Sequence, residues 1–128
     1  MNYLLDTHLI LWATVTPARL SSKAKFLLED QNNLIQFSPA SLWEVVIKSA
    51  LGREDFNVDP HVLRRALIDN DYIELPILSQ HTVAIQQLPP LHKDPFDRIL
   101  IAQATVEGVI LLTTDRRVSS YPGPIQLV

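Results

Sequence analysis

Five short apolar runs constrain the fold of this chain more than any other feature of its sequence. They cover residues 2–5, 34–37, 72–75, 109–112 and 125–128, and the stretches between them carry apolar side chains at helical spacing. Strands that alternate with helices in this way are typical of α/β proteins, in which helices cover both faces of a parallel sheet. The sequence therefore predicts an α/β/α sandwich with a mainly parallel central sheet. No repeat or linker interrupts the pattern, so we expect a single domain over residues 1–128.

Four acidic residues stand where such a sheet would bring them together. Asp6 directly follows the first strand, and Asp115 follows the fourth after two threonines. Glu44 lies within two turns of the start of the helix after the second strand, and Asp97 lies in the first turn of a helix that ends at Gly108. Ligands of open parallel sheets bind outside the carboxyl ends of the strands. The four carboxylates are therefore predicted to converge on one edge of the sheet.

The segment 92–104 has the pattern of a loop that turns into a helix. Pro95 suits the first helical position because it has no N–H to lose there. Asp94 would then be the N-cap, and Asp97 would be the third helical residue, N3. Apolar residues follow at helical spacing: Phe96, Ile99, Leu100 and Ala104. Helix capping alone would explain Asp94, which we treat as either an N-cap or an additional ligand.

Each of the other acids also has a purely structural interpretation. Asp6 and Asp115 could cap the segments that follow them, and Glu44 could be the N3 partner of Ser41 in a capping box. Four carboxylates in one cleft are harder to explain in that way, because converging negative charges repel unless a cation lies between them. A site of oxygen ligands, without cysteine or a close pair of histidines, favours Mg²⁺ or Mn²⁺ over Zn²⁺.

Composition narrows the class of partner. The absence of cysteine excludes disulfides and thiolate sites and fits a cytoplasmic protein. A net charge of −3 gives no support to a protein that binds nucleic acid through a generally basic surface. It is compatible with an enzyme that approaches nucleic acid through a bound metal ion. Three glycines and no glycine-rich loop argue against a nucleotide cofactor. No run reaches the ~18 residues of a membrane span, and we expect no signal peptide and no membrane association.

The chain resembles PIN-domain proteins, and in particular the VapC-type toxins of bacterial toxin–antitoxin pairs. The resemblance runs through nearly the whole chain in order, on the segments Leu5-Asp6-Thr7, Trp43-Glu44, Asp94-Pro95-Phe96-Asp97-Arg98, Ile101-Ala102-Gln103-Ala104 and Leu112-Thr113-Thr114-Asp115. It implies a Rossmann-like fold and Mg²⁺-dependent hydrolysis of RNA that leaves 5′-phosphate and 3′-hydroxyl ends. It also implies a cognate antitoxin as partner.

The resemblance assigns roles to individual residues. It places the three core metal-binding acids at Asp6, Glu44 and Asp97 and a more variable fourth at Asp115. It implies that the hydroxyls of two threonines, Thr7 and Thr114, support the metal ligands. Three arginines beside these acids are candidates for contacts to flanking phosphates, or else solvated charges: Arg98, Arg116 and Arg117. His8 and His92, also close by in sequence, are interpreted as capping or surface groups, with a catalytic role as the alternative for either one.

Two other functions stay open at this point. A non-catalytic module could keep the fold only to hold a partner protein. A phosphoryl-transfer domain of the haloacid-dehalogenase or receiver type also has aspartates at strand ends. The first of these types needs a second Asp two residues after the first, where this chain has His8, and the receiver type needs adjacent early acids and a late lysine that the sequence does not supply.

Apolar side chains on two predicted helices point to self-association. The helices around residues 21–30 and 38–51 carry more large apolar residues than a small sheet covers, among them Phe26, Leu27, Trp43 and Ile47. We therefore expect a homodimer, which the resemblance also implies.

Overall fold

A five-stranded, entirely parallel sheet organises the computed structural model, which describes residues 1–128. The strand order is β3-β2-β1-β4-β5, with β1 and β4 paired in the centre. The strands are β1 (Asn2–Leu5), β2 (Leu34–Phe37), β3 (Ile73–Glu74), β4 (Ile110–Thr113) and β5 (Ile125–Leu127). The predicted α/β fold class is confirmed.

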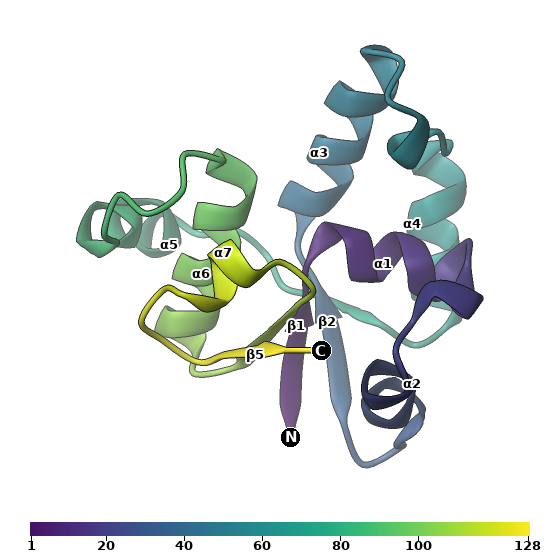
Figure 1. Ribbon diagram of the computed structural model, residues 1–128, viewed down its shortest axis with the longest axis horizontal. Helices are drawn as coiled ribbons and strands as arrows, with labels where there is room; N and C mark the ends of the chain where they lie inside the picture. The colour runs from purple at the N-terminus through teal and green to yellow at the C-terminus, as the bar shows by residue number, and fades with distance from the viewer.

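Seven α-helices connect the strands and lie on both sides of the sheet (Figure 1). They are α1 (Thr7–Thr14), α2 (Ser22–Glu29), α3 (Pro39–Ala50), α4 (Pro60–Asp69), α5 (Ser79–Ala84), α6 (Pro95–Glu107) and α7 (Arg116–Ser119). Short 3-10 turns occupy Pro17–Arg19, Glu54–Phe56 and Ile85–Gln87. Figure 1 places α1, α2 and α4 on one side and α5, α6 and α7 on the other, while α3 rises from the end of β2. 

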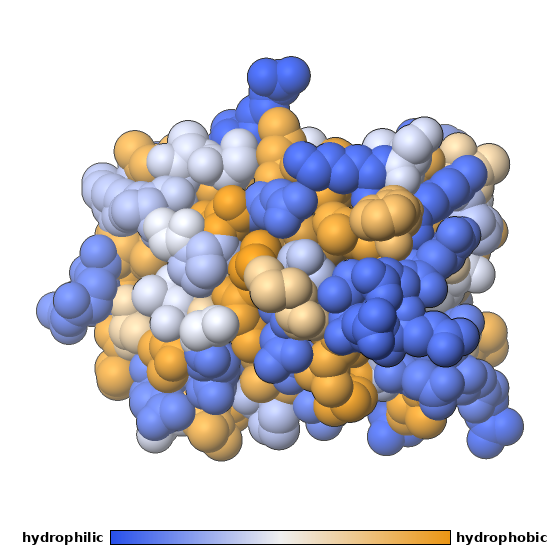
Figure 2. All heavy atoms as spheres, turned by 90° about the horizontal axis from the view of Figure 1, so that it is seen from below, coloured by the Kyte–Doolittle hydropathy of each residue, from blue (hydrophilic) through white to orange (hydrophobic).

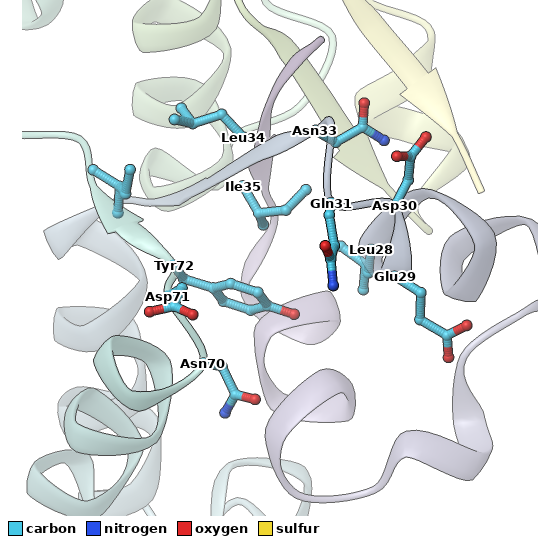
Figure 3. Close-up of a pocket in the computed structure, with 11 residues that line it drawn as sticks. Leu28, Glu29, Asp30, Gln31, Asn33, Leu34, Ile35, Asn70, Asp71 and Tyr72 are labelled. Atoms are coloured by element: carbon cyan, nitrogen blue, oxygen red, sulfur yellow. The ribbon is translucent and has the colours of Figure 1, made fainter.

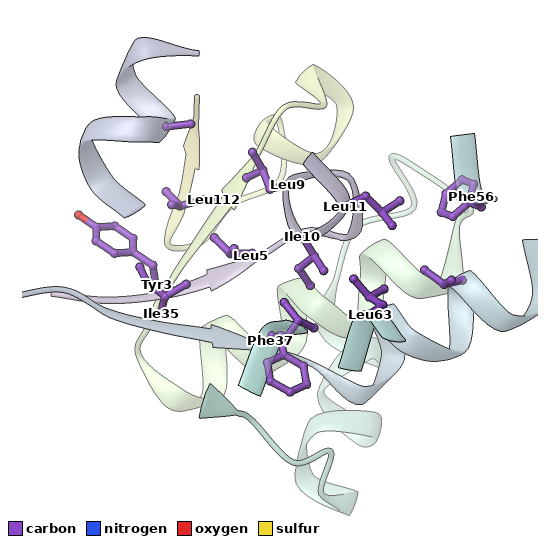
Figure 4. Close-up of a cluster of buried hydrophobic side chains, with 13 residues drawn as sticks. Tyr3, Leu5, Leu9, Ile10, Leu11, Ile35, Phe37, Phe56, Leu63 and Leu112 are labelled. Carbon is purple, nitrogen blue, oxygen red and sulfur yellow. The ribbon is translucent and has the colours of Figure 1, made fainter. Parts of the chain in front are cut away.

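Side chains that alternate along the strands separate the core into two clusters. Tyr3 and Leu5 of β1 point into the larger cluster, which packs against α1 to α4 (Figure 4). Leu4, between them, points to the opposite face and packs with residues of α6 and α7. Leu112 and Leu111 of β4 divide in the same way. This alternation is the period of two that a strand buried on both faces requires.

The third strand is shorter than its apolar run. The run 72–75 predicts four residues, but β3 comprises only Ile73 and Glu74, and both are exposed. β3 is an edge strand that pairs with β2 alone. A very short edge strand limits the row of unpaired N–H and C=O groups that the edge of a sheet exposes.

The outer surface is mixed in character. Figure 2, which views the molecule from the side where β1 begins, shows apolar and hydrophilic side chains interleaved. No helix combines the length and the apolar character needed to cross a bilayer.

Gln103 of α6 holds the segment that leaves β3. Its side chain is fully buried, and its Nε2 donates to the carbonyl oxygens of Leu75 at 3.1 Å and Pro76 at 3.3 Å. Gln103→Leu removes the donor and leaves the Leu75 carbonyl buried without it, so we expect a loss of about 1–3 kcal/mol in the free energy of unfolding by urea. Thr105→Ala, on the exposed side of the same helix, should stay within about 0.5 kcal/mol of wild type. Equal losses in the two variants would contradict this role.

Candidate active site

A cleft of about 270 Å³ opens where β1 and β4 end and α3 and α6 begin. Every side chain that lines it is polar or charged: Asp6, Thr7, His8, Glu44, Lys48, Arg53, Asp94, Asp97, Asp115 and Arg117. The structure thus brings all four predicted acids, and Asp94 with them, to a single cleft at the carboxyl edge of the sheet. This is the edge at which parallel sheets bind ligands.

Asp6 lies deepest and is held by uncharged donors. The residue is only 5% exposed. One oxygen, Oδ1, accepts the N–H of Leu9 at 2.9 Å and caps α1. The other, Oδ2, accepts the hydroxyl of Thr113 at 2.7 Å and the N–H of Thr114 at 3.2 Å. Burial raises the pKa of the Asp6 carboxyl above its ordinary value, although these hydrogen bonds oppose the rise.

Glu44 is buried on α3 and is not part of a capping box with Ser41. The N-cap of α3 is Ser38, whose hydroxyl accepts the N–H of Ala40, so Ser41 lies inside the helix. Thr7 donates from Oγ1 to Glu44 Oε1 at 2.6 Å, and its oxygen lies 3.1 Å from the Ser41 hydroxyl. The helix begins three residues earlier than the capping-box interpretation required, and this places Glu44 in the second turn, facing the cleft.

Asp94 and Asp97 lie at the start of α6. Asp94 is the N-cap, and its Oδ1 accepts the N–H of Phe96 at 2.9 Å. Asp97 Oδ2 lies 2.8 Å from His92 Nε2. Burial, followed by the charge of Asp94, raises the pKa of Asp97 to about 6, against the hydrogen bond from His92. Ligand atoms of His92, Asp94 and Asp97 all lie within 4.8 Å of one another, so His92 belongs to the site and is not a surface group.

Asp115 lines the cleft from the connection between β4 and α7. It caps α7 by accepting the N–H of Arg117 at 2.8 Å, and the Arg117 guanidinium lies 3.3 Å from Asp115 Oδ2. Partial burial raises the pKa of Asp115, but the hydrogen bonds and charge of Arg117 outweigh it and hold the pKa below its ordinary value. Asp115 therefore brings its own counter-charge to the cleft.

The predicted phosphate-contacting arginines lie in different surroundings. Arg98 does not line the cleft. Its guanidinium donates to the carbonyl oxygen of Pro89 at 3.0 Å and to the hydroxyl of Tyr121 at 3.1 Å, beneath the loop that precedes α6. Arg116 is exposed and also outside the cleft, whereas Arg117 lines it. A side chain that holds loop carbonyls has its donors engaged, and this favours a structural role for Arg98.

Three contributors were missed from the sequence, and one of them, Arg53, lines the cleft from the connection after α3. The hydroxyl on Asp6 belongs to Thr113, the last residue of β4, whereas the sequence pointed to the hydroxyl of Thr114. Lys48 enters the cleft from α3 and pairs with Glu44. The spacing of four between Glu44 and Lys48 could have revealed that pair.

The donor set fits a hard divalent cation. The charges of Asp94, Glu44 and Asp6 each raise the pKa of Asp97, so these carboxylates are close enough to repel one another. Because carboxylate oxygens predominate in this set, it suits Mg²⁺ or Mn²⁺. The site is therefore an acidic one of the kind that holds a metal ion.

A larger hollow, of about 520 Å³, lies elsewhere (Figure 3). It is formed by the end of α2, the start of β2 and the turn before β3, and the Tyr72 ring lies beside it. Burial raises the pKa of the Tyr72 phenol. The hollow is at the amino ends of the strands and gathers no comparable set of converging carboxylates, so we assign the chemistry to the smaller, acidic cleft.

The fold and this acidic edge define a PIN domain. The sequence model of the PIN domain family matches residues 3–124, and the chain belongs to that family. No curated protein matches the chain.

Three solved structures that share the fold are VapBC complexes. VapBC2 from Rickettsia felis, bound to a promoter DNA fragment, matches with a TM-score of 0.72 and 14% identity over 100% of this chain and 99% of that chain. DNA-bound VapBC from Salmonella typhimurium matches with a TM-score of 0.68 and 15% identity over 98% of this chain and 97% of that chain. VapBC-1 from nontypeable Haemophilus influenzae matches with a TM-score of 0.62 and 18% identity over 99% of this chain and 98% of that chain. The likeness covers the full length of the chain, and at these identities it shows the fold. The predicted resemblance to PIN domains is confirmed.

The raised pKa of Asp97 predicts a dependence of stability on pH. A carboxyl whose pKa is higher in the folded than in the unfolded state stabilises the fold at low pH and loses that contribution as the pH rises through the folded value. Without divalent metal, the melting temperature of wild type should therefore fall relative to that of Asp97→Asn between pH ~4 and ~7. Asp69→Asn, an exposed acid outside the cleft, should follow wild type. Parallel curves for wild type and Asp97→Asn would contradict the prediction.

Proposed function

We propose that this protein is a Mg²⁺-dependent ribonuclease, the toxin of a toxin–antitoxin pair, and that Mn²⁺ can replace Mg²⁺. The observation that carries the proposal is the cleft of five carboxylates at the carboxyl edge of a PIN-domain sheet. Asp6, Glu44, Asp97 and Asp115 are the proposed catalytic and metal-binding residues. When bound, the metal neutralises the scissile phosphate and lowers the pKa of the attacking water.

The chain's own residues prepare this chemistry in distinct ways. Asp6 and Asp97 carry negative charge with no Lys or Arg partner and are the principal carboxylates for a cation. Glu44, fixed by the hydroxyl of Thr7, completes the acidic wall. Arg53 and Arg117 line the cleft and supply positive charge for the phosphates of a bound strand. The lining of the cleft is wholly polar, which suits a charged substrate.

The proposal includes a cognate antitoxin as partner and the cytoplasm as location. It is supported by the fold shared with chains of VapBC complexes. A small DNA-binding protein encoded beside this chain would be the candidate, and its inhibition of RNA cleavage is the test.

RNA cleavage should separate the proposed metal ligands of the cleft from Asp94, which caps α6 and is not proposed as a ligand. In Mg²⁺, Asp97→Asn should reduce the rate by orders of magnitude because a ligand is lost. Asp94→Ser should keep both cleavage and stability, because Ser caps nearly as well as Asp, whereas Asp94→Ala should cost roughly 1 kcal/mol of stability. The measurement is the rate on one RNA at fixed Mg²⁺, together with melting curves of each variant.

The controls distinguish the remaining functions. Removal of the metal with a chelator should abolish cleavage, and Mg²⁺ should restore it. If cleavage is lost in Asp94→Ser but kept in Asp97→Asn, the metal ligand is Asp94 and not Asp97. A folded wild type that cleaves no RNA in either metal would favour the non-catalytic binding module.

We also propose that the protein is a homodimer, joined through the exposed side of α3. Trp43 is 61% exposed and Val46 48%, beside an apolar hollow of about 260 Å³ between α3, α5 and α6. The Trp43 ring contacts that of Phe96, with ring centres 5.3 Å apart. Phe26, which is 71% exposed, lies on α2, away from this face (Figure 1). One self-complementary apolar face is what a two-fold dimer requires.

The two exposed aromatic residues give a matched test of the dimer face. Wild type at tens of micromolar should scatter light as a dimer, and Trp43→Arg should scatter as a monomer because a charge then interrupts the apolar face. Phe26→Arg carries the same change on α2 and should stay dimeric. A monomeric wild type would contradict the dimer, and dissociation by Phe26→Arg alone would place the interface on α2.

A further inference from the structure

Lys48 places a positive charge inside the acidic cleft. Its Nζ pairs with Glu44 Oε2 at 2.5 Å and lies 3.7 Å from Asp94 Oδ2. Glu44 lies on α3 and Asp94 at the start of α6, so the ammonium connects two walls of the cleft. The Lys48 side chain is only 19% exposed, and the Glu44 side chain is only 4% exposed. The pair therefore differs from the solvated i, i+4 pairs that contribute little on helix surfaces.

Aromatic rings hold the lysine in place. The ammonium lies 4.9 Å from the centre of the Phe56 ring and 5.9 Å from that of Phe96. Phe56 is fully buried in the main core cluster and provides a fixed surface. Two carboxylates and two ring faces together restrain Lys48, because each contact is an attraction for the same cation.

The carboxylates of the cleft fall into two groups by their counter-charges. Asp115 is paired with Arg117, and Glu44 and Asp94 share Lys48. Asp6 accepts hydrogen bonds only from uncharged groups. His92 is the only partner of Asp97. The negative charge without a lysine or arginine is thus concentrated on Asp6 and Asp97.

We propose that Lys48 takes the place of a second metal ion, so that the cleft binds one divalent cation, at Asp6 and Asp97. In two-metal sites the ions lie about 3.5–4 Å apart and together neutralise the surrounding carboxylates. Here the ammonium already occupies Glu44 and Asp94, and its charge opposes a second cation between them. Lys48 is a positioning residue that also sets the metal stoichiometry. The inference rests on the metal dependence proposed above.

The number of bound ions tests the proposal without an activity assay. We would titrate the full chain with Mn²⁺ and count bound ions by electron paramagnetic resonance and calorimetry. Wild type and Lys48→Arg should bind one ion per chain. Lys48→Gln and Lys48→Met, which keeps the apolar stem beside the rings, should bind a second ion. They should also hold the first on the order of tenfold more tightly, because a nearby unit charge is removed.

A second lysine provides the matched control. Lys93 is exposed beside Asp94 and forms no ion pair, so Lys93→Gln changes the net charge equally and should still bind one ion. Two ions in wild type, or one ion with unchanged affinity in both uncharged Lys48 variants, would overturn the proposal and leave the ribonuclease proposal standing. If wild type binds no ion, the metal dependence beneath both proposals is wrong.

Discussion

The burial of the Asp6 carboxylate at the junction of β1 and β4 is the constraint on which the rest of the site depends. A buried carboxylate without hydrogen-bond partners would be costly. The structure meets this requirement with the N–H of Leu9 on one oxygen and with two groups at the end of β4, from Thr113 and Thr114, on the other. The same residue that brings charge to the cleft therefore also fastens the two central strands together and starts α1.

Helix capping and cleft formation are performed by the same carboxylates. Asp6, Asp94 and Asp115 each accept a backbone N–H of the helix that they precede. In Asp6 and Asp94 a single oxygen, Oδ1, makes this bond, and Oδ2 faces other groups. A carboxylate has two oxygens, so one can satisfy the helix while the other serves the cleft. From the sequence these roles looked like competing interpretations, because a residue type alone does not show how its two oxygens are used.

Local sequence patterns predicted the fold and which acids share the cleft. They failed for details that depend on contacts between residues far apart in the sequence. Alternating apolar runs were sufficient for the parallel sheet, and strand ends were sufficient to bring Asp6 and Asp115 to one edge. The choice between Thr113 and Thr114 depends on where β4 ends and which way its last side chain points, and a shift of one residue reverses that direction. The length of β3 likewise depends on its pairing with β2, and the role of Arg98 depends on its contacts with Pro89 and Tyr121, which the local sequence does not show.

The position of the loop before α6 depends on a residue far along the chain. Tyr121 is 4% exposed, and its hydroxyl accepts the N–H of His92 at 2.8 Å and lies 2.9 Å from the carbonyl oxygen of the same residue. Arg98 adds a third bond to that hydroxyl from below the loop. His92 in turn holds Asp97. Asp97, a carboxylate whose pKa is raised to about 6, is thus positioned through a chain of contacts that starts near the C-terminal strand. No pattern within residues 92–104 contains that information, so the sequence could identify the acids of this segment but not what holds them in place.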